Sequence, residues 1–124
     1  IMARVGGRLT WIGGAGDDCG AMYAAIGVRA FTSSVSAILP RLALAWGDAA
    51  LAGDFECLNE MLTRYVHPLF AIRARKRGYE VAVMKKAAAL LGRPCGQARP
   101  PIPEVGPAEV DDLRRFLETC REYI

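Results

Sequence analysis

The chain has 124 residues, of which 52% are hydrophobic, and this size suits one modest domain. Its net charge of +3, from 16 basic and 13 acidic residues, is spread without a long basic stripe, so we expect no nucleic-acid partner. The four cysteines lie far apart with no Cys-x-x-Cys pair, which argues against a zinc site and a disulfide framework and favours reduced thiols.

No stretch of the sequence has the pattern of a membrane span or a leader. The most apolar part, residues 30–52, contains Pro40, Arg41 and Asp48, which interrupt the roughly 20 apolar residues that a spanning helix needs. The N-terminus lacks the charged and then apolar plan of a signal peptide. We therefore expect a cytoplasmic protein with no membrane partner.

The first third of the chain predicts a strand, a helix and a second strand. Residues 9–12 alternate in polarity and run into the Gly-rich loop 13–16. Asp17 or Asp18 is then a candidate N-cap for a short helix that ends at Gly27. A second apolar run over residues 28–36 follows directly. Such a unit normally forms a right-handed crossover between parallel strands.

The remainder is predicted to be helical. One helix begins at Pro40 and ends at Gly53, and the next begins at an Asp54 cap, with a break expected near Val66 and His67 because Pro68 follows. A third helix runs from residue 77 to 92, a Pro-rich irregular connector covers 92–106, and a last helix follows from 107. On a helical wheel the third helix has its predicted core stripe at Val81, Met84, Ala88 and Leu91.

Four stretches of sequence, in order, resemble the C-terminal part of the dihydrodipicolinate synthase / N-acetylneuraminate lyase family. They are Gly16-Asp17-Asp18, AFTSSVSAILP at 30–40, IRARKRGYEVAVMKKAAALLG at 72–92, and CGQARPPIPEV at 95–105. The third stretch, with Gly78, Tyr79, Val81 and Lys85, is most similar to the 5-dehydro-4-deoxyglucarate dehydratase branch. The resemblance covers roughly residues 8–117, and the order and spacing of the motifs carry it.

This resemblance implies an α/β fold that is mostly helical by content: a C-terminal fragment of a (β/α)8 barrel with strands seven and eight, plus a helical extension. Residues 1–53 would be the last two βα units and residues 54–124 the extension packed on them. The family's Schiff-base lysine lies on the sixth strand and would precede residue 1. We therefore expect no catalytic residue here, an inactive fragment when isolated, and no cofactor or metal.

The candidate substrate-binding residues are Gly16, Thr32, Ser33 and Ser34. Gly-rich loops are often plain turns, but the amides of this one could also hold an anion at the start of the following helix. The resemblance implies that residues after strands seven and eight border a 2-oxo-acid site, where hydroxyls could hydrogen-bond a carboxylate. Relatives often have an asparagine where this chain has Ala37, which bears on substrate identity.

Other polar residues have simpler interpretations. Lys85 and Lys86 fall opposite the predicted stripe and are expected to be solvated or at an interface, because a Schiff-base lysine needs a desolvated pocket. His67, the sole histidine, has no evident partner and is interpreted as structural. The cluster at residues 73–77 is expected to be a solvated helix end, with a subunit contact as the alternative.

The resemblance implies a parent lyase that forms a lysine Schiff base with a 2-oxo sugar acid and converts 5-dehydro-4-deoxyglucarate to 2,5-dioxopentanoate by loss of water and carbon dioxide. The alternatives are another family member, such as dihydrodipicolinate synthase or a 2-oxo-acid aldolase, and a non-catalytic helical module that associates through its unpaired strand edges. We expect a homo-oligomer in either case.

Overall fold

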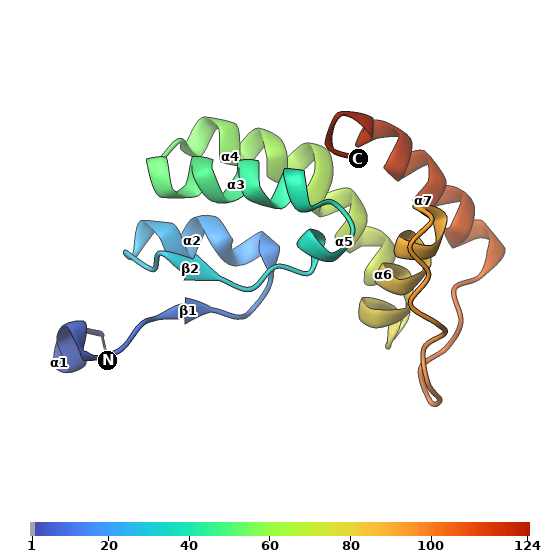
Figure 1. Ribbon diagram of the computed structural model, residues 1–124, viewed down its shortest axis with the longest axis horizontal. Helices are drawn as coiled ribbons and strands as arrows, with labels where there is room; N and C mark the ends of the chain where they lie inside the picture. Colours follow the sequence, from blue (N-terminus) through green and yellow to red (C-terminus); the bar gives the residue numbers. More distant parts are fainter. Residues whose placement is uncertain (1) are drawn as a thin grey trace.

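The computed structural model describes residues 2–124, most of which are helical, with one small sheet in the N-terminal part (Figure 1). Strands β1 (Ile12–Gly13) and β2 (Ala30–Phe31) are paired in parallel, with Ile12 opposite Ala30 and Gly13 opposite Phe31. The 3-10 turn η2 (Asp17–Cys19) and helix α2 (Gly20–Ala25) connect them. The predicted order of strand, helix and parallel strand is confirmed, although both strands are shorter than expected.

The first strand begins later than predicted, and the second ends earlier. Residues 9–11 were predicted to begin the first strand but precede it, after the short helix α1 (Met2–Val5) and the turn η1 (Gly6–Arg8), which bury no side chain. After β2, residues Val35–Ala37 form the 3-10 turn η3, not strand. The amides of Ser34 and Val35 donate to Asp17 at 3.0 and 3.3 Å, and this holds the backbone out of the sheet.

Helices α3 (Pro40–Ala52) and α4 (Phe55–Met61) have the ends that the sequence predicts. Pro40 stands in the first turn of α3, and Gly53 ends it with a left-handed φ of 73°. The Asp54 carboxylate accepts a hydrogen bond from the Cys57 amide at 3.0 Å and caps α4. The expected break is confirmed as the π-helical turn η4 (Leu62–Val66), which leads into α5 (His67–Arg73). Pro68 has no N–H to continue the α-helical ladder there.

The core lies between α3 and the helices that follow it. Its completely buried side chains include Leu39, Leu69, Val83 and Leu113. Helix α6 (Tyr79–Leu90) packs against α5 and against α7 (Pro107–Thr119), and the turn η5 (Arg121–Tyr123) ends the chain. The predicted core stripe of α6 is confirmed in part: Ala88 is buried and Met84 and Leu91 pack partly buried against the core, but Val81 is exposed. The buried residues of α6 are Tyr79, Ala82, Val83, Ala87 and Ala88. Small alanines let α6 approach its neighbours closely, and this turns Val81 outward.

The basic cluster after α5 is more than a solvated helix end. Arg75 forms ion pairs with Glu109 and Asp112 of α7, and Arg73 turns inward to Ser34. The hydrogen bond from the Arg75 guanidinium holds the pKa of the Asp112 carboxyl below its usual range. The cluster therefore ties α5 to α7 and to the segment after β2. His67 is exposed, and its structural interpretation stays a prediction.

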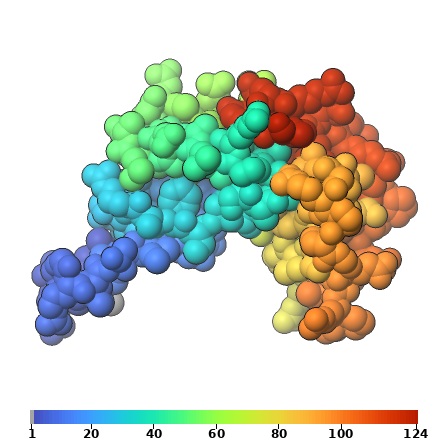
Figure 2. Space-filling view, viewed as in Figure 1, coloured from blue at the N-terminus to red at the C-terminus, as the bar shows by residue number. Residues whose placement is uncertain are grey.

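Figure 2 shows the N-terminal segment and the irregular connector projecting on the same side of the molecule, with a hollow between them. The connector after Gly92 has no regular structure up to α7, as predicted. Among residues 2–124 no helix has the length and apolar character needed to cross a bilayer. The division of the chain at residue 53 stays a prediction.

Candidate functional site

The loops that follow β1 and β2 lie next to each other because the two strands are parallel. Pairing continues one residue past β2, where the Thr32 amide and hydroxyl both donate to the Gly13 carbonyl, at 2.8 and 3.3 Å. In α/β barrels and open parallel sheets the carboxyl ends of strands are where sites are built. The residues after Gly13 and Phe31 therefore occupy the position of a site.

Asp17 is the centre of this cluster. It is the one charged residue among those described that is classed as buried, with an exposed fraction of 4%. Its carboxylate accepts hydrogen bonds from the Ser33 hydroxyl, from the Ser34 amide and hydroxyl at 3.0 and 2.9 Å, and from the Val35 amide. A buried carboxylate is tolerated when donors surround it in this way. Asp17 thus fastens the loop after β1 to the loop after β2.

Arg73 is the positively charged residue that these hydrogen bonds connect to the Asp17 carboxylate. Its Nη1 donates to the Ser34 hydroxyl at 2.9 Å, and the same hydroxyl donates to Asp17, so the guanidinium reaches the carboxylate through Ser34. The guanidinium also lies over the Phe70 ring, 4.3 Å from its centroid. Its Nε is buried and makes no hydrogen bond within the described residues. Three segments, β1–η2, β2–η3 and α5, therefore meet in one polar network.

Gly16 is required by the backbone at this point. Its φ is 142°, a region that favours glycine, and a Cβ would lie 2.7 Å from Oδ1 of Asp18. Its carbonyl accepts from the Cys19 amide at 3.1 Å and starts η2. The Gly-rich loop therefore makes the sharp turn that brings Asp17 beneath the end of β2.

Of the four predicted site residues, Ser33 and Ser34 are both bonded to Asp17, and Gly16 directly precedes Asp17 in the chain. Thr32 is bonded to the Gly13 carbonyl. The Ser33 and Ser34 hydroxyls donate their protons to Asp17 and accept from the Ser36 amide and from Arg73, so in this arrangement each has one acceptor lone pair left for a ligand. Their part in substrate binding stays a prediction. The expected N-cap role of Asp17 or Asp18 is wrong, since neither η2 nor α2 has a side-chain cap.

Sequence reasoning missed Asp17 as the anchor and Arg73 as its remote partner. The sequence did contain a signal for the Asp17 anchor: an acidic residue follows the first predicted strand, and a Ser-Ser pair follows the second, parallel strand. No signal pointed to Arg73, which is 39 residues from Ser34. In the described part of the chain no three His, Cys, Asp or Glu side chains converge on a possible metal position, and all four cysteines are free thiols.

Comparison with known proteins decides the family. A model of the "Dihydrodipicolinate synthetase family" matches residues 1–120, which is almost the whole chain. The chain belongs to the dihydrodipicolinate synthetase family. The resemblance drawn from the sequence motifs is therefore confirmed.

Two curated relatives of this family member have the same name. A "Probable 5-dehydro-4-deoxyglucarate dehydratase" of Acinetobacter baumannii (strain AB307-0294) is 32% identical over 121 residues, covering 96% of this chain and 40% of that protein. A protein of the same name from Methylobacterium radiotolerans is 36% identical over 119 residues, covering 94% and 39%. The chain thus spans about two fifths of the length of these relatives.

Two solved structures have the same fold over this part of the chain. Dihydrodipicolinate synthase from Oceanobacillus iheyensis aligns with a TM-score of 0.80 at 24% identity, over 90% of this chain and 37% of that one. "KD(P)GA from T.tenax" aligns with a TM-score of 0.73 at 22% identity, over 98% and 42%. The parallel β1–β2 unit and its helices therefore match part of a larger fold, as expected for a portion of a (β/α)8 barrel.

Proposed function

We propose that these residues form one wall of the active site of a Schiff-base lyase that acts on a 2-oxo sugar acid, in the manner of a 5-dehydro-4-deoxyglucarate dehydratase. The observation that carries the proposal is the joined pair of loops at the ends of two parallel strands, which holds Gly16, Ser33 and Ser34 around Asp17. The names of the curated relatives support this choice of substrate. In this proposal β1 and β2 are the seventh and eighth barrel strands.

The proposed chemistry uses an amine from polypeptide outside these residues. A lysine there would attack the 2-oxo carbon and expel water to give an imine, which withdraws electrons from the neighbouring carbon. Loss of a proton from that carbon and elimination of the β-hydroxyl as water would follow. Decarboxylation, and hydrolysis of the imine by one water to free the lysine, would complete the change to 2,5-dioxopentanoate. The net products are the dioxo acid, one water and one carbon dioxide, without a metal or organic cofactor.

The positions of the lysines in this chain support a catalytic amine from outside these residues. Lys76 and Lys86 are exposed. Lys85 lies on α6, away from β1 and β2, and donates to the backbone carbonyls of Cys95 and Gln97 in the connector. None of them lies in the cluster around Asp17. A catalytic amine must be desolvated near the reacting carbon. In our proposal the described residues therefore bind the substrate and shape its site, and they do not form the imine bond to it.

The proposed function is tested with a protein that carries this chain together with the segments matching the rest of its relatives. We expect it to release carbon dioxide from 5-dehydro-4-deoxyglucarate and to form 2,5-dioxopentanoate, measured by isotope release and mass spectrometry. Consumption of pyruvate with an aldehyde acceptor, with no release of carbon dioxide from the sugar acid, would instead favour the synthase or aldolase alternative.

A second candidate function, association with another chain, is favoured by exposed apolar side chains. Ile12, Met22, Ile26, Leu44 and Phe55 are each more than half exposed, and each strand of the two-stranded sheet has an unpaired edge. For this second candidate we propose that another copy of the chain covers these surfaces in a homo-oligomer. Light scattering over a range of concentrations tests self-association of the isolated chain, and a monomer at every concentration would contradict it.

A further inference from the structure

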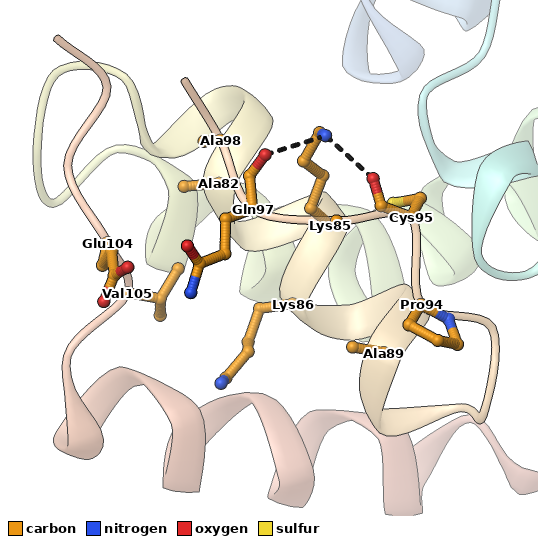
Figure 3. A pocket seen from close by; sticks show the side chains of 11 residues that line it. Ala82, Lys85, Lys86, Ala89, Pro94, Cys95, Gln97, Ala98, Glu104 and Val105 are labelled. Atoms are coloured by element: carbon orange, nitrogen blue, oxygen red, sulfur yellow. Dashed lines mark hydrogen bonds between the residues drawn. The ribbon is translucent and has the colours of Figure 1, made fainter. Parts of the chain in front are cut away.

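A second concave feature lies between α6 and the irregular connector. It has a volume of about 290 Å³, close to the lower end of small-molecule sites. The α6 side is built from Ala82 and Ala89, and the connector side includes Ala98 and Val105 (Figure 3). It shares no lining residue with the cluster around Asp17. This hollow, called the α6 pocket below, is used by nothing in the proposed function.

Lys85 holds the far wall of the α6 pocket in place. Its ammonium donates to the carbonyls of Cys95 and Gln97, at 3.0 and 3.2 Å (Figure 3). Lys85 is half-buried and bonded to the connector, and the expectation that it is solvated or at an interface stays a prediction. The connector is also anchored by Arg93, which donates to the Ile38 carbonyl, and by the Gly106 amide, which donates to the Tyr79 hydroxyl. The pocket thus has two fixed walls.

Three charged side chains line the α6 pocket: Lys85, whose ammonium is already bonded to the two connector carbonyls, and Lys86 and Glu104, which have opposite charges. Neither Lys86 nor Glu104 forms an ion pair within residues 2–124. Figure 3 shows the Gln97 amide between the Lys86 ammonium and the Glu104 carboxylate. An ammonium and an amide N–H suit one carboxylate group, whereas Glu104 would repel a second one. Apolar surface of the pocket comes from Ala82, Ala89 and Val105.

We propose that the α6 pocket binds a small monocarboxylate with a short apolar body. The carboxylate would pair with Lys86 and accept from Gln97, and the apolar body would cover the alanine surface of α6. A ligand of so few heavy atoms has an affinity on the order of millimolar. Because Glu104 faces the opposite end, the pocket selects against dicarboxylates of similar length.

The test is a titration of the chain with butyrate and with glutarate, followed by amide chemical shifts in NMR spectra. We expect butyrate to shift the amides of Ala82, Ala89 and Gln97, and glutarate to bind at least about threefold more weakly. Lys86→Gln should weaken butyrate binding about fivefold, or about 1 kcal/mol. Lys76→Gln removes the same charge outside the pocket and should leave the affinity unchanged.

Ala89→Leu provides a test that does not alter charge. Leucine is a good helix former and Ala89 is exposed, so the variant keeps the fold while it fills the pocket. We expect it to abolish the butyrate shifts. The proposal is overturned if butyrate produces no shifts at these amides, if Lys86→Gln or Ala89→Leu binds as the unaltered chain does, or if glutarate binds as tightly as butyrate.

Discussion

Replacement of Asp17 by asparagine is expected to destabilise the fold by about 2 to 3 kcal/mol, because the four donors that surround this buried carboxylate would meet an amide that is itself a donor. Two of these donors are backbone amides, which cannot turn away, and the Ser34 hydroxyl is also held by Arg73. The loop after β2 should loosen first. Urea unfolding, followed by circular dichroism, measures the loss.

Asp18 is the matched control for this substitution. It is the next residue, carries the same charge and is exposed, and its side chain makes no hydrogen bond among the residues described. Asp18→Asn should change the unfolding free energy by less than about 0.5 kcal/mol. Equal unfolding midpoints for the Asp17 and Asp18 variants would show that the Asp17 network does not hold the two loops together.

Replacement of Gly20 by alanine is expected to cost about 3 kcal/mol, the second large effect. A Cβ at this position would overlap the ring of Trp46, which is buried and packs edge-on against Phe31 with ring centroids 5.0 Å apart. Helix propensity alone predicts the opposite sign, since alanine in a helix is favoured over glycine by about 1 kcal/mol. Urea unfolding followed by tryptophan fluorescence measures the change.

Gly14 is the control for Gly20. It lies in the loop after β1, where a Cβ would meet nothing within 4 Å, so Gly14→Ala should leave stability nearly unchanged. If Gly20→Ala is as stable as the parent chain or more so, α2 does not pack on α3 as described. Such a result would also remove the support that α2 gives to the β1–β2 unit.

The sequence predicted the elements whose signals are local. Pro40, Gly53, Asp54 and Pro68 each act within one helical turn, and the caps and the break they predict are present. The parallel pairing of the strands also followed, because a single short helix between two apolar runs leaves few other topologies. The candidate site residues after the two strands were predicted from the family motifs, and not from the local sequence pattern.

What could not be predicted depends on contacts distant in sequence. Aspartate is a residue type that favours N-caps, but the hydrogen-bond partners of Asp17 are 16 to 18 residues away in the loop after β2. The buried face of α6 is decided by which neighbouring helices its alanines can approach. A helical wheel of α6 alone does not contain that information. Arg73 could be placed only once α5 had been packed against the strand ends.

Reductive trapping tests the central claim most directly, namely that these residues shape a 2-oxo-acid site without supplying its reactive amine. The chain is incubated with pyruvate and sodium borohydride, with a Schiff-base aldolase treated in parallel, and its intact mass is measured. We predict an unchanged mass, because Lys76, Lys85 and Lys86 all lie away from the loops joined by Asp17. A single stoichiometric adduct on one of these lysines would contradict the account.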